Sequence, residues 1–199
     1  MLLQYIIKGE TEEDIMAQAR AALDAGIVWL EIKAAESVPD DVLASILDSL
    51  RSELAEKNCV LILADRLEAA KELKADGVHL YDVSRPASAA RVALEAWPII
   101  GVDVSCRADA ESLRGYDIDY LVAHMAGDES LGLLGEIAGY LAEKDVETPL
   151  VAAGNINAGN ISAIAGAGAN AVAIDASVAC GAESLCQAVS EMKKLADAL

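Results

Sequence analysis

Apolar runs and amphipathic stretches alternate along the whole chain, and the same junction between them recurs. The clearest examples are ALDAGIVWLEIK (22–33), ELKADGVHLYDV (72–83) and IAGAGANAVAIDA (164–176). In each segment a helical stretch reaches a Gly, and a run rich in β-branched residues follows. A Gly just past a helix takes the left-handed conformation that ends the helix. We therefore expect Gly26, Gly77 and Gly168 to separate helices from the strands that follow.

The apolar runs show little alternation, which is typical of strands covered on both faces. They predict strands near residues 2–7, 27–33, 59–64, 78–82, 98–104, 118–123, 149–153 and 170–175. The stretches between them predict helices near residues 11–24, 39–56, 66–74, 86–96, 108–114, 130–144, 158–166 and 182–197. The chain is therefore expected to contain eight strand–helix units with short connections.

Strict alternation of strand and helix implies parallel strands with right-handed crossovers. Eight such units close most economically into a (β/α)8 TIM barrel, so residues 1–199 are expected to form one barrel domain. An open doubly wound sheet is the alternative fold. No Gly-rich dinucleotide fingerprint follows the first predicted strand, so the sequence does not favour that alternative.

The charge of the chain narrows the classes of partner. The 199 residues include 33 acidic and 15 basic ones, which gives a net charge of −18. The resulting field repels polyanions, so neither nucleic acid nor an anionic membrane is an expected partner. A small phosphorylated substrate is compatible with this charge if local cations or helix N-termini face it.

Nothing in the sequence indicates export or membrane insertion. The start MLLQYIIKGETEED lacks the basic region and the length of a signal peptide. No window approaches the roughly 18 consecutive apolar residues of a membrane span. The cysteines form no CxxC pair and no zinc spacing, and we interpret them as reduced thiols of a cytoplasmic protein. They are Cys59, Cys106, Cys180 and Cys186.

In a (β/α)8 barrel the site lies at the C-terminal ends of the strands. Several apolar runs of this chain end in polar residues, which the fold would bring together at one mouth. These candidate site residues are Lys8, Glu31, Lys33, Asp65, Arg66, Asp82, Arg85, Asp103, His124, Asn155, Asp175 and Ser177.

Some of these residues have a catalytic and a structural interpretation. Asp65 follows a strand where a ligand would bind, but it is also a candidate N-cap for the helix that begins near Leu67. His124 ends the run YLVAHM and is a candidate acid or base. His79 lies in the middle of a strand and is interpreted as a hydrogen-bonded core residue. Lys33 ends the buried run IVWLEIK and is interpreted as an anion-binding residue.

The segment VAAGNINAGNISAIAGAGANAVAIDAS (151–177) is the candidate phosphate site. In many barrels the loops after the last two strands hold a phosphate through backbone N–H groups. Gly154 would let the backbone approach a ligand, Asn155 could cap it, and Ser177 lies just past the last strand. Ordinary tight turns are the alternative interpretation.

Five stretches together resemble the thiamine-phosphate synthase family and its thiazole-tautomerase relatives. They are LILADRLEAAKELKADGVHL (61–80), PASAARVALEAWPIIGVDV (86–104), DIDYLVA (117–123), TPLVAAGNI (148–156) and AGANAVAIDASV (167–178). The resemblance covers roughly residues 27–180, and ADGVHL is its most specific part. It implies a (β/α)8 barrel that joins a pyrimidine diphosphate to a thiazole phosphate and releases pyrophosphate, with Mg²⁺ bridging the diphosphate.

The resemblance also implies roles for individual residues. Asp65 matches the first metal-binding aspartate of the family, and Lys33 stands where an arginine usually contacts the pyrophosphate. Gly154 matches the first Gly of the phosphate loop. Asp82 is a displaced candidate for the second metal ligand, because Ser84 occupies the matching position.

Other positions depart from the family pattern. Ala35 replaces a lysine, Ala64 replaces an asparagine, and Glu31 replaces a glutamine that faces the pyrimidine. Asn155 replaces the second Gly of the phosphate loop. Fewer cations and more acids make a diphosphate harder to hold at this mouth.

Three functions remain open on this reasoning. A divergent synthase would hold Mg²⁺ and a diphosphate at the mouth, using Asp65, Asp82, Lys33, Arg66 and Lys8. A thiazole-tautomerase-like isomerase needs only a phosphate site and a proton shuttle, and His124 stands where the tautomerases carry their histidine. A non-catalytic barrel would bind a cation or partner at an acidic ring of Glu31, Asp65, Asp82, Asp103 and Asp175. The apolar stretch SLGLLGEIAGYL (130–141) could pack in a homodimer or in the core.

Overall fold

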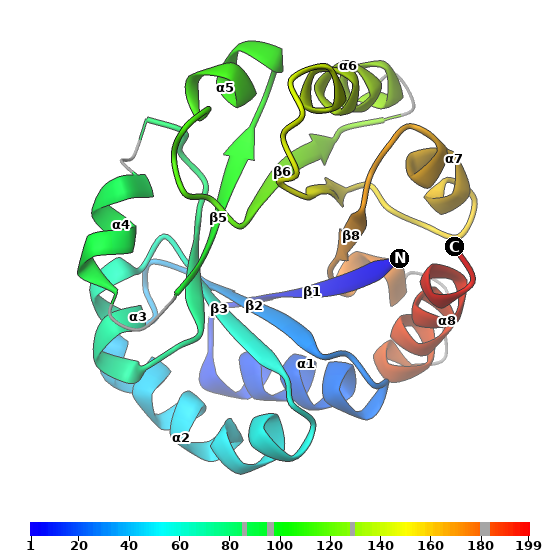
Figure 1. Ribbon diagram of the computed structural model, residues 1–199. Coiled ribbons are helices and arrows are strands. Elements are labelled where there is room, and N and C mark those ends of the chain that lie inside the picture. Colours follow the sequence, from blue (N-terminus) through cyan, green and yellow to red (C-terminus); the bar gives the residue numbers. More distant parts are fainter. Residues whose placement is uncertain (85–86, 95–97, 128–129, 180–183) are drawn as a thin grey trace.

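The computed structural model describes residues 1–84, 87–94, 98–127, 130–179 and 184–199. Its strands form a closed barrel in sequence order, and β8 pairs with β1 to complete the ring. All neighbouring strands are parallel, and the helices surround the barrel (Figure 1). The predicted (β/α)8 barrel is confirmed.

The strands and helices follow the predicted order. The strands are β1 (Leu2–Gly9), β2 (Trp29–Ala34), β3 (Val60–Ala64), β4 (Gly77–Leu80), β5 (Ile99–Val104), β6 (Tyr120–Met125), β7 (Leu150–Gly154) and β8 (Ala171–Ile174). The helices are α1 (Glu12–Asp24), α2 (Asp40–Glu56), α3 (Leu67–Leu73), α4 (Ala87–Ala93), α5 (Arg107–Ser112), α6 (Ser130–Glu143), α7 (Ile161–Gly166), the 3-10 helix η1 (Ala176–Ala179) and α8 (Leu185–Asp197). No helix of the described residues has both the length and the apolar character needed to cross a bilayer.

Glycine plays two different parts at the junctions between helices and strands. Gly26 and Gly168 have φ values of +82° and +104°, so the predicted left-handed conformation is confirmed there. Gly77 is an exception, because Lys74 takes the left-handed conformation that ends α3. Gly77 is instead the first residue of β4, and a Cβ atom there would overlap the carbonyl oxygen of Ile99 on β5. The requirement for Gly at position 77 is therefore the close approach of two strands.

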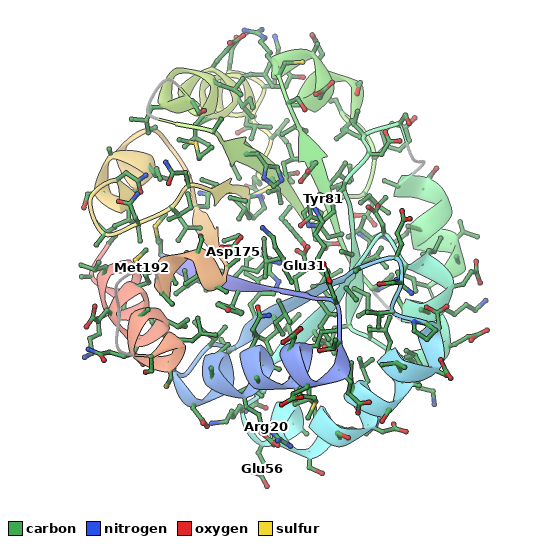
Figure 2. All side chains as sticks on the ribbon, turned by 180° about the vertical axis from the view of Figure 1, so that it is seen from behind. Arg20, Glu31, Glu56, Tyr81, Asp175 and Met192 are labelled. Atoms are coloured by element: carbon green, nitrogen blue, oxygen red, sulfur yellow. The ribbon has the colours of Figure 1, made fainter. Side chains whose placement is uncertain are left out.

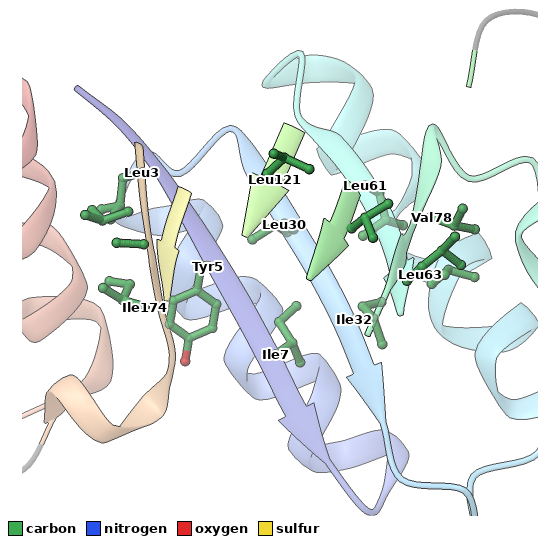
Figure 3. Close-up of a cluster of buried hydrophobic side chains, with 14 of the residues drawn as sticks. Leu3, Tyr5, Ile7, Leu30, Ile32, Leu61, Leu63, Val78, Leu121 and Ile174 are labelled. Carbon is green, nitrogen blue, oxygen red and sulfur yellow. The ribbon is translucent and has the colours of Figure 1, made fainter. Parts of the chain in front are cut away.

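Strand residues alternate between the helix layer and the barrel interior. The large core cluster contains the side chains that face the helices, among them Tyr5, Ile7, Leu30 and Ile32 (Figure 3). A smaller cluster fills the interior with Ile6, Tyr120, Val122, Val151, Ala153, Ala171 and Ala173. Because successive strand side chains point to opposite faces, residues between the helix-facing ones point inward. The three buried polar residues of the described chain, Gln4, Glu31 and His79, are all inward-facing.

We call the strand starts the N-terminal rim and the strand ends the C-terminal rim. At the N-terminal rim one arrangement occurs three times. The residue just before β4, β6 or β8 donates its backbone N–H to the carbonyl of a residue on the preceding strand. Its side chain accepts the backbone N–H of that strand residue in return. The pairs are Asp76 with Leu61 (2.9 and 2.7 Å), Asp119 with Ile100 (2.9 and 2.8 Å) and Asn170 with Leu150 (2.8 and 2.8 Å). These side chains therefore fix the register where a strand begins.

Candidate functional site

Glu31 lies inside the barrel, surrounded by hydrogen-bond donors. Its Oε2 accepts from the Nε2–H of Gln4 at 3.1 Å, and its Oε1 accepts from the hydroxyl of Tyr81 at 2.7 Å. The Nδ1 of His79 lies 2.8 Å from the same Oε2. The Glu31 side chain is fully buried, so the expectation that it lies at the open mouth is wrong. Figure 2 shows Glu31, Tyr81 and Asp175 around the barrel axis, whereas Arg20 and Glu56 lie on the outer helices.

A row of acidic and imidazole groups continues from Glu31 to the C-terminal rim. The Nε2 of His79 lies 3.0 Å from Oδ1 of Asp103, and the Nε2 of His124 lies 2.9 Å from Oδ2. The exposed fraction of the side chain rises along this row, from zero at His79 to 14% at Asp103 and 45% at His124. The predicted candidate acid or base, His124, is thus the solvent-facing end of a buried network.

The charges in this row support one another. Burial alone would lower the pKa of His79, but Glu31 and Asp103 outweigh it and raise the pKa to about 9. Burial acts to raise the pKa of Asp103, but its hydrogen bonds to His124 and His79 prevail and the pKa is lowered. The row is therefore an imidazolium held between two carboxylates near neutral pH.

Lys33 and Tyr81 lie next to each other beside this row. The Nζ of Lys33 lies 3.2 Å from the centroid of the Tyr81 ring, a cation–π contact. Partial burial lowers the pKa of Lys33, although Glu31 and Asp103 act in the opposite direction. Burial and the neighbouring Glu31 raise the pKa of Tyr81, so its hydroxyl remains a hydrogen-bond donor. The cation expected at this position is held over an aromatic ring beside the acidic row.

Lys8 and Asp175 form an ion pair between the ends of β1 and β8. Burial acts to raise the pKa of Asp175, but hydrogen bonds from Lys8 and Ser177 lower it. The backbone N–H of Ser177 donates to Oδ1 of Asp175 at 2.9 Å. Ser177 itself is exposed and lies in η1.

Gly154 allows a close backbone approach in the turn after β7, and the backbone that it approaches is that of β6. Gly154 has φ +99°, and a Cβ atom there would lie 2.6 Å from the carbonyl oxygen of Met125. The N–H of Asn155 donates to that same oxygen at 3.0 Å. The backbone N–H groups of Asn155 and Ser177 thus already have acceptors within the chain, and the hydroxyl of Ser177 also bonds to Asp175. Both residues are exposed, so their side chains are accessible to a ligand.

The loops after β3 and β4 differ from what was expected. The N-cap of α3 is Arg66, so the interpretation of Asp65 as the helix cap is wrong. Asp65 has φ +53°, and its Oδ1 accepts from the N–H of Tyr81 at 3.1 Å. Arg66 donates to Oδ1 of Asp40 at 2.7 Å and to the carbonyl of Ala35 at 2.8 Å, so it links two loops.

The other candidates after β4 lie in a local turn. Oδ1 of Asp82 accepts from the backbone N–H and from the hydroxyl of Ser84, at 2.8 and 2.7 Å. Arg85 and Cys180 lie outside the described residues.

The carboxylates near the rim are the groups that could hold Mg²⁺. No group of three or more His, Cys, Asp or Glu in the described parts of the chain could hold a metal ion by itself. Mg²⁺ in enzymes is commonly bound by one or two carboxylates together with substrate phosphates. Asp65 is kept in a left-handed conformation that is unfavourable for a non-Gly residue, with its carboxylate directed to the end of β4. Mg²⁺ at this rim would therefore need ligands from a bound substrate, because the described residues form no metal site by themselves.

The sequence-based reasoning missed the partners of His79. It placed this residue correctly in the core, but not between two carboxylates, and it gave Gln4 and Tyr81 no role in the site. The alternation of side chains along each strand could have shown that these residues share one face. Each of them lies between two helix-facing residues: Glu31, His79, Asp103 and His124. They therefore had to face the same interior.

The closed barrel and its ionisable cluster at the C-terminal rim define a (β/α)8-barrel enzyme. Over residues 3–178 the sequence matches the profile of the thiamine monophosphate synthase family. A thiamine-phosphate synthase of Bacteroides fragilis is 32% identical over 186 residues, which cover 88% of this chain and 91% of the relative. The chain therefore belongs to the thiamine monophosphate synthase family, and the resemblance seen in the sequence is confirmed.

Further relatives agree over nearly the whole length. A thiamine-phosphate synthase of Albidiferax ferrireducens is 29% identical and covers 98% of this chain and 90% of its own. The solved structure of a thiamine phosphate pyrophosphorylase from Pyrococcus furiosus superposes with a TM-score of 0.83 at 25% identity, covering 98% of this chain and 96% of that one. The likeness thus extends to the complete barrel.

Proposed function

We propose that this enzyme joins a hydroxymethylpyrimidine diphosphate to a thiazole phosphate and releases pyrophosphate. The observation that carries the proposal is the family match, which runs from β1 to η1 and so includes the end of every strand that contributes to the rim. The reaction needs cations and a metal near a departing diphosphate. Lys33, Lys8 and Asp65 are the matching groups at this rim.

Each group has a definite task in this proposal. Lys33 and Lys8 would bind the diphosphate, with Arg66 keeping the neighbouring loop in place. Asp65 and Asp82 would hold Mg²⁺, which supplies charge neutralisation on the departing pyrophosphate. The turn at Gly154 and Asn155 and the hydroxyl of Ser177 would bind the thiazole phosphate. Asp103 and Asp175 line the mouth, while the buried Glu31 acts through Tyr81 and His79.

One observation favours a second candidate, proton transfer on a thiazole phosphate. His124 is half exposed at the rim and hydrogen-bonded to a carboxylate, the arrangement of a general acid or base. This reaction requires a phosphate site but no diphosphate site. It therefore tolerates Ala35 and Ala64 at positions where the family carries polar residues.

Calorimetry separates the two candidates. Thiazole phosphate is titrated into the protein alone, and pyrimidine diphosphate is titrated with and without Mg²⁺. Binding of both ligands, the diphosphate only with Mg²⁺, is the result expected for the synthase. Binding of the thiazole alone supports the proton-transfer enzyme. Heat from neither ligand would contradict both and favour a non-catalytic barrel.

Two substitutions give a reciprocal test. Asp65→Ala is expected to lower synthase turnover by about 100-fold, because it removes a metal ligand, and to leave proton transfer on thiazole phosphate unchanged. His124→Ala is expected to lower proton transfer by about 100-fold or more, with affinity for thiazole phosphate retained. Each variant is the control for the other in turnover assays. Full Mg²⁺-dependent synthesis by Asp65→Ala would contradict the assignment of Asp65 as a metal ligand of the synthase.

A further inference from the structure

The exposed ring of His124 is the last member of a row that crosses the barrel. Four strands supply the row: β6 carries His124, β5 carries Asp103, β4 carries His79 and β2 carries Glu31. The three links measure 2.9, 3.0 and 2.8 Å. Beyond Glu31 the row ends in neutral donors, Gln4 and Tyr81.

The chemistry of the partners fixes where the hydrogens lie. An ionised carboxylate only accepts hydrogen bonds. Glu31 faces Nδ1 of His79 and Asp103 faces Nε2, so both ring nitrogens of His79 donate. The remaining oxygen of Asp103 faces Nε2 of His124, which must also donate. The hydrogen-bonding role of each group in the row thus determines which nitrogen of the next ring carries a hydrogen.

Such a row is not explained by stability. Buried ionic groups contribute little net stability compared with apolar side chains of similar size. The same barrel fills its interior at β7 and β8 with Val151, Ala153, Ala171 and Ala173. An apolar filling was therefore available to this fold, and the ionic row needs another reason.

We propose that Glu31, His79 and Asp103 are positioning residues that hold the His124 ring with its proton on Nε2, so that Nδ1 is the atom that exchanges a proton with a phosphorylated heterocycle at the mouth. This inference rests on the proton-transfer function proposed for His124. It assigns a purpose to the buried Glu31–His79 pair, which the binding of substrate does not use.

The chain has only two histidines, so ¹⁵N-histidine NMR reports on the two rings without crowding. A protonated and a bare ring nitrogen differ widely in ¹⁵N chemical shift, and His124→Ala assigns the two sets of signals. In the unaltered protein we expect His79 with both nitrogens protonated. We expect neutral His124 in the Nε2–H form alone.

Asp103→Asn tests the transmission of orientation along the row. His79 donates to this residue, so the side-chain oxygen of the new Asn must face His79, and its NH₂ group must face His124. His124 is then expected to change to the Nδ1–H form, with kcat for proton transfer reduced about a thousandfold and KM changed less than about twofold. An unchanged form of His124 in this variant would overturn the proposal.

The double variant Glu31→Gln with Asp103→Asn tests whether the Nε2–H form of His124 can be restored. Without the charge of Glu31, His79 becomes neutral and can accept from the NH₂ group of the new Asn, which then turns its oxygen to His124. The Nε2–H form should return, and part of the lost kcat with it. A double variant that behaves like Asp103→Asn alone would show that Glu31 and His79 have no positioning role.

Two further measurements keep the test decisive. If Asp103→Asn does not fold, Glu31→Gln alone should leave one bare nitrogen on His79, and two protonated nitrogens there would contradict the proposal. Tyr140→Phe is the matched control, because it removes a buried hydroxyl that has no hydrogen-bond partner among the described residues and that lies in the helix layer, away from the row. It should alter neither ring. The NMR result needs no substrate, so failure of the unaltered protein to transfer a proton on thiazole phosphate would refute the proton-transfer function separately.

Discussion

Two aspartates of neighbouring strands bond to different kinds of group. Asp76 lies just before β4, and Asp103 lies near the end of β5. At the N-terminal rim, Asp76 accepts from the backbone N–H of Leu61. At the C-terminal rim, Asp103 accepts from two imidazole rings. The first aspartate completes the backbone hydrogen bonding of the barrel, and the second belongs to a network of side chains that reaches the solvent.

This difference indicates how the two rims divide their tasks. Backbone partners occur where strands begin, because the N–H of the preceding strand would otherwise lack an acceptor. Side-chain partners occur where strands end, where the fold places the site. Substitutions at the N-terminal rim should therefore affect folding, and substitutions at the C-terminal rim should mainly affect binding and chemistry.

The largest expected effect on stability is at Gly77. In Gly77→Ala the new Cβ would overlap the backbone of Ile99, and neither strand can move without opening the barrel. We expect a loss of about 3 kcal/mol or more in the free energy of unfolding, measured by chemical denaturation. Gly132→Ala on α6 is the control, because a Cβ there meets nothing within 4 Å. It should stabilise the helix by about 0.5–1 kcal/mol, and equal effects of the two substitutions would contradict the close-approach argument.

The buried part of the row, inside the barrel, should give the protein a pH-dependent stability. Glu31 and Asp103 outweigh burial and raise the pKa of His79 from 6.5 to about 9. The stabilisation is then complete below about pH 6.5 and is lost as the pH rises to about 9. At about 1.4 kcal/mol for each pH unit, the loss is at most roughly 3–4 kcal/mol.

Denaturation curves across this pH window test the raised pKa of His79. His79→Gln should remove this part of the slope, since its side chain does not titrate. A free energy of unfolding that stays constant through the window in the unaltered protein would show that the two carboxylates do not stabilise the charged ring.

Asp76 offers a smaller and sharper test at the N-terminal rim. Asp76→Ala leaves the N–H of Leu61 without its side-chain acceptor and should cost about 1–3 kcal/mol in unfolding free energy. Asp76→Asn should cost less, because Asn170 makes the same bond naturally before β8. Neither variant should change the affinity for thiazole phosphate. A loss of ligand affinity with stability unchanged would reverse the roles assigned to the two rims.

The fold could be predicted from the sequence because each of its determinants is local. A capping signal, a left-handed Gly and an apolar run act within a few residues, as at Gly26 and Gly168. Gly77 looked the same in the sequence, but its role depends on Ile99, which belongs to another strand. The failure there has a physical cause, because no local pattern reports the distance between two backbones.

The candidate site was predictable only as a set of residues. The ends of the apolar runs placed Lys33, Asp103 and His124 at one rim, but not the bonds among them. Whether a side chain faces the interior follows from parity along its strand, while its partner depends on the register between strands. The bond between Glu31 and His79 joins β2 to β4, and nothing in the sequence specifies the distance between them.

The smallest expected effect on stability is at Lys8. A substitution there should instead change the affinity for phosphate, which distinguishes the two rims. Lys8 is half exposed and pairs with Asp175, and an exposed pair contributes at most about 1 kcal/mol. Lys8→Met should therefore change the free energy of unfolding by less than that, yet it removes a cation from the mouth. We expect the affinity for inorganic phosphate, measured by calorimetry, to fall several-fold at low salt. This difference should shrink at high salt, because exposed charges are screened.

Lys193→Met is the matched control for Lys8→Met, since Lys193 also pairs with a carboxylate, Asp197 on α8. It lies beside Gly26, just ahead of β2 at the opposite rim. Each substitution removes one positive charge and makes the net charge of −18 more negative by the same amount, so a general effect of charge would weaken phosphate binding in both. Loss confined to Lys8→Met places the anion at the C-terminal rim, because only there does the removed charge face the ligand. Equal losses would mean that phosphate responds to the overall field of this acidic protein and that Lys8 holds no particular place in the site.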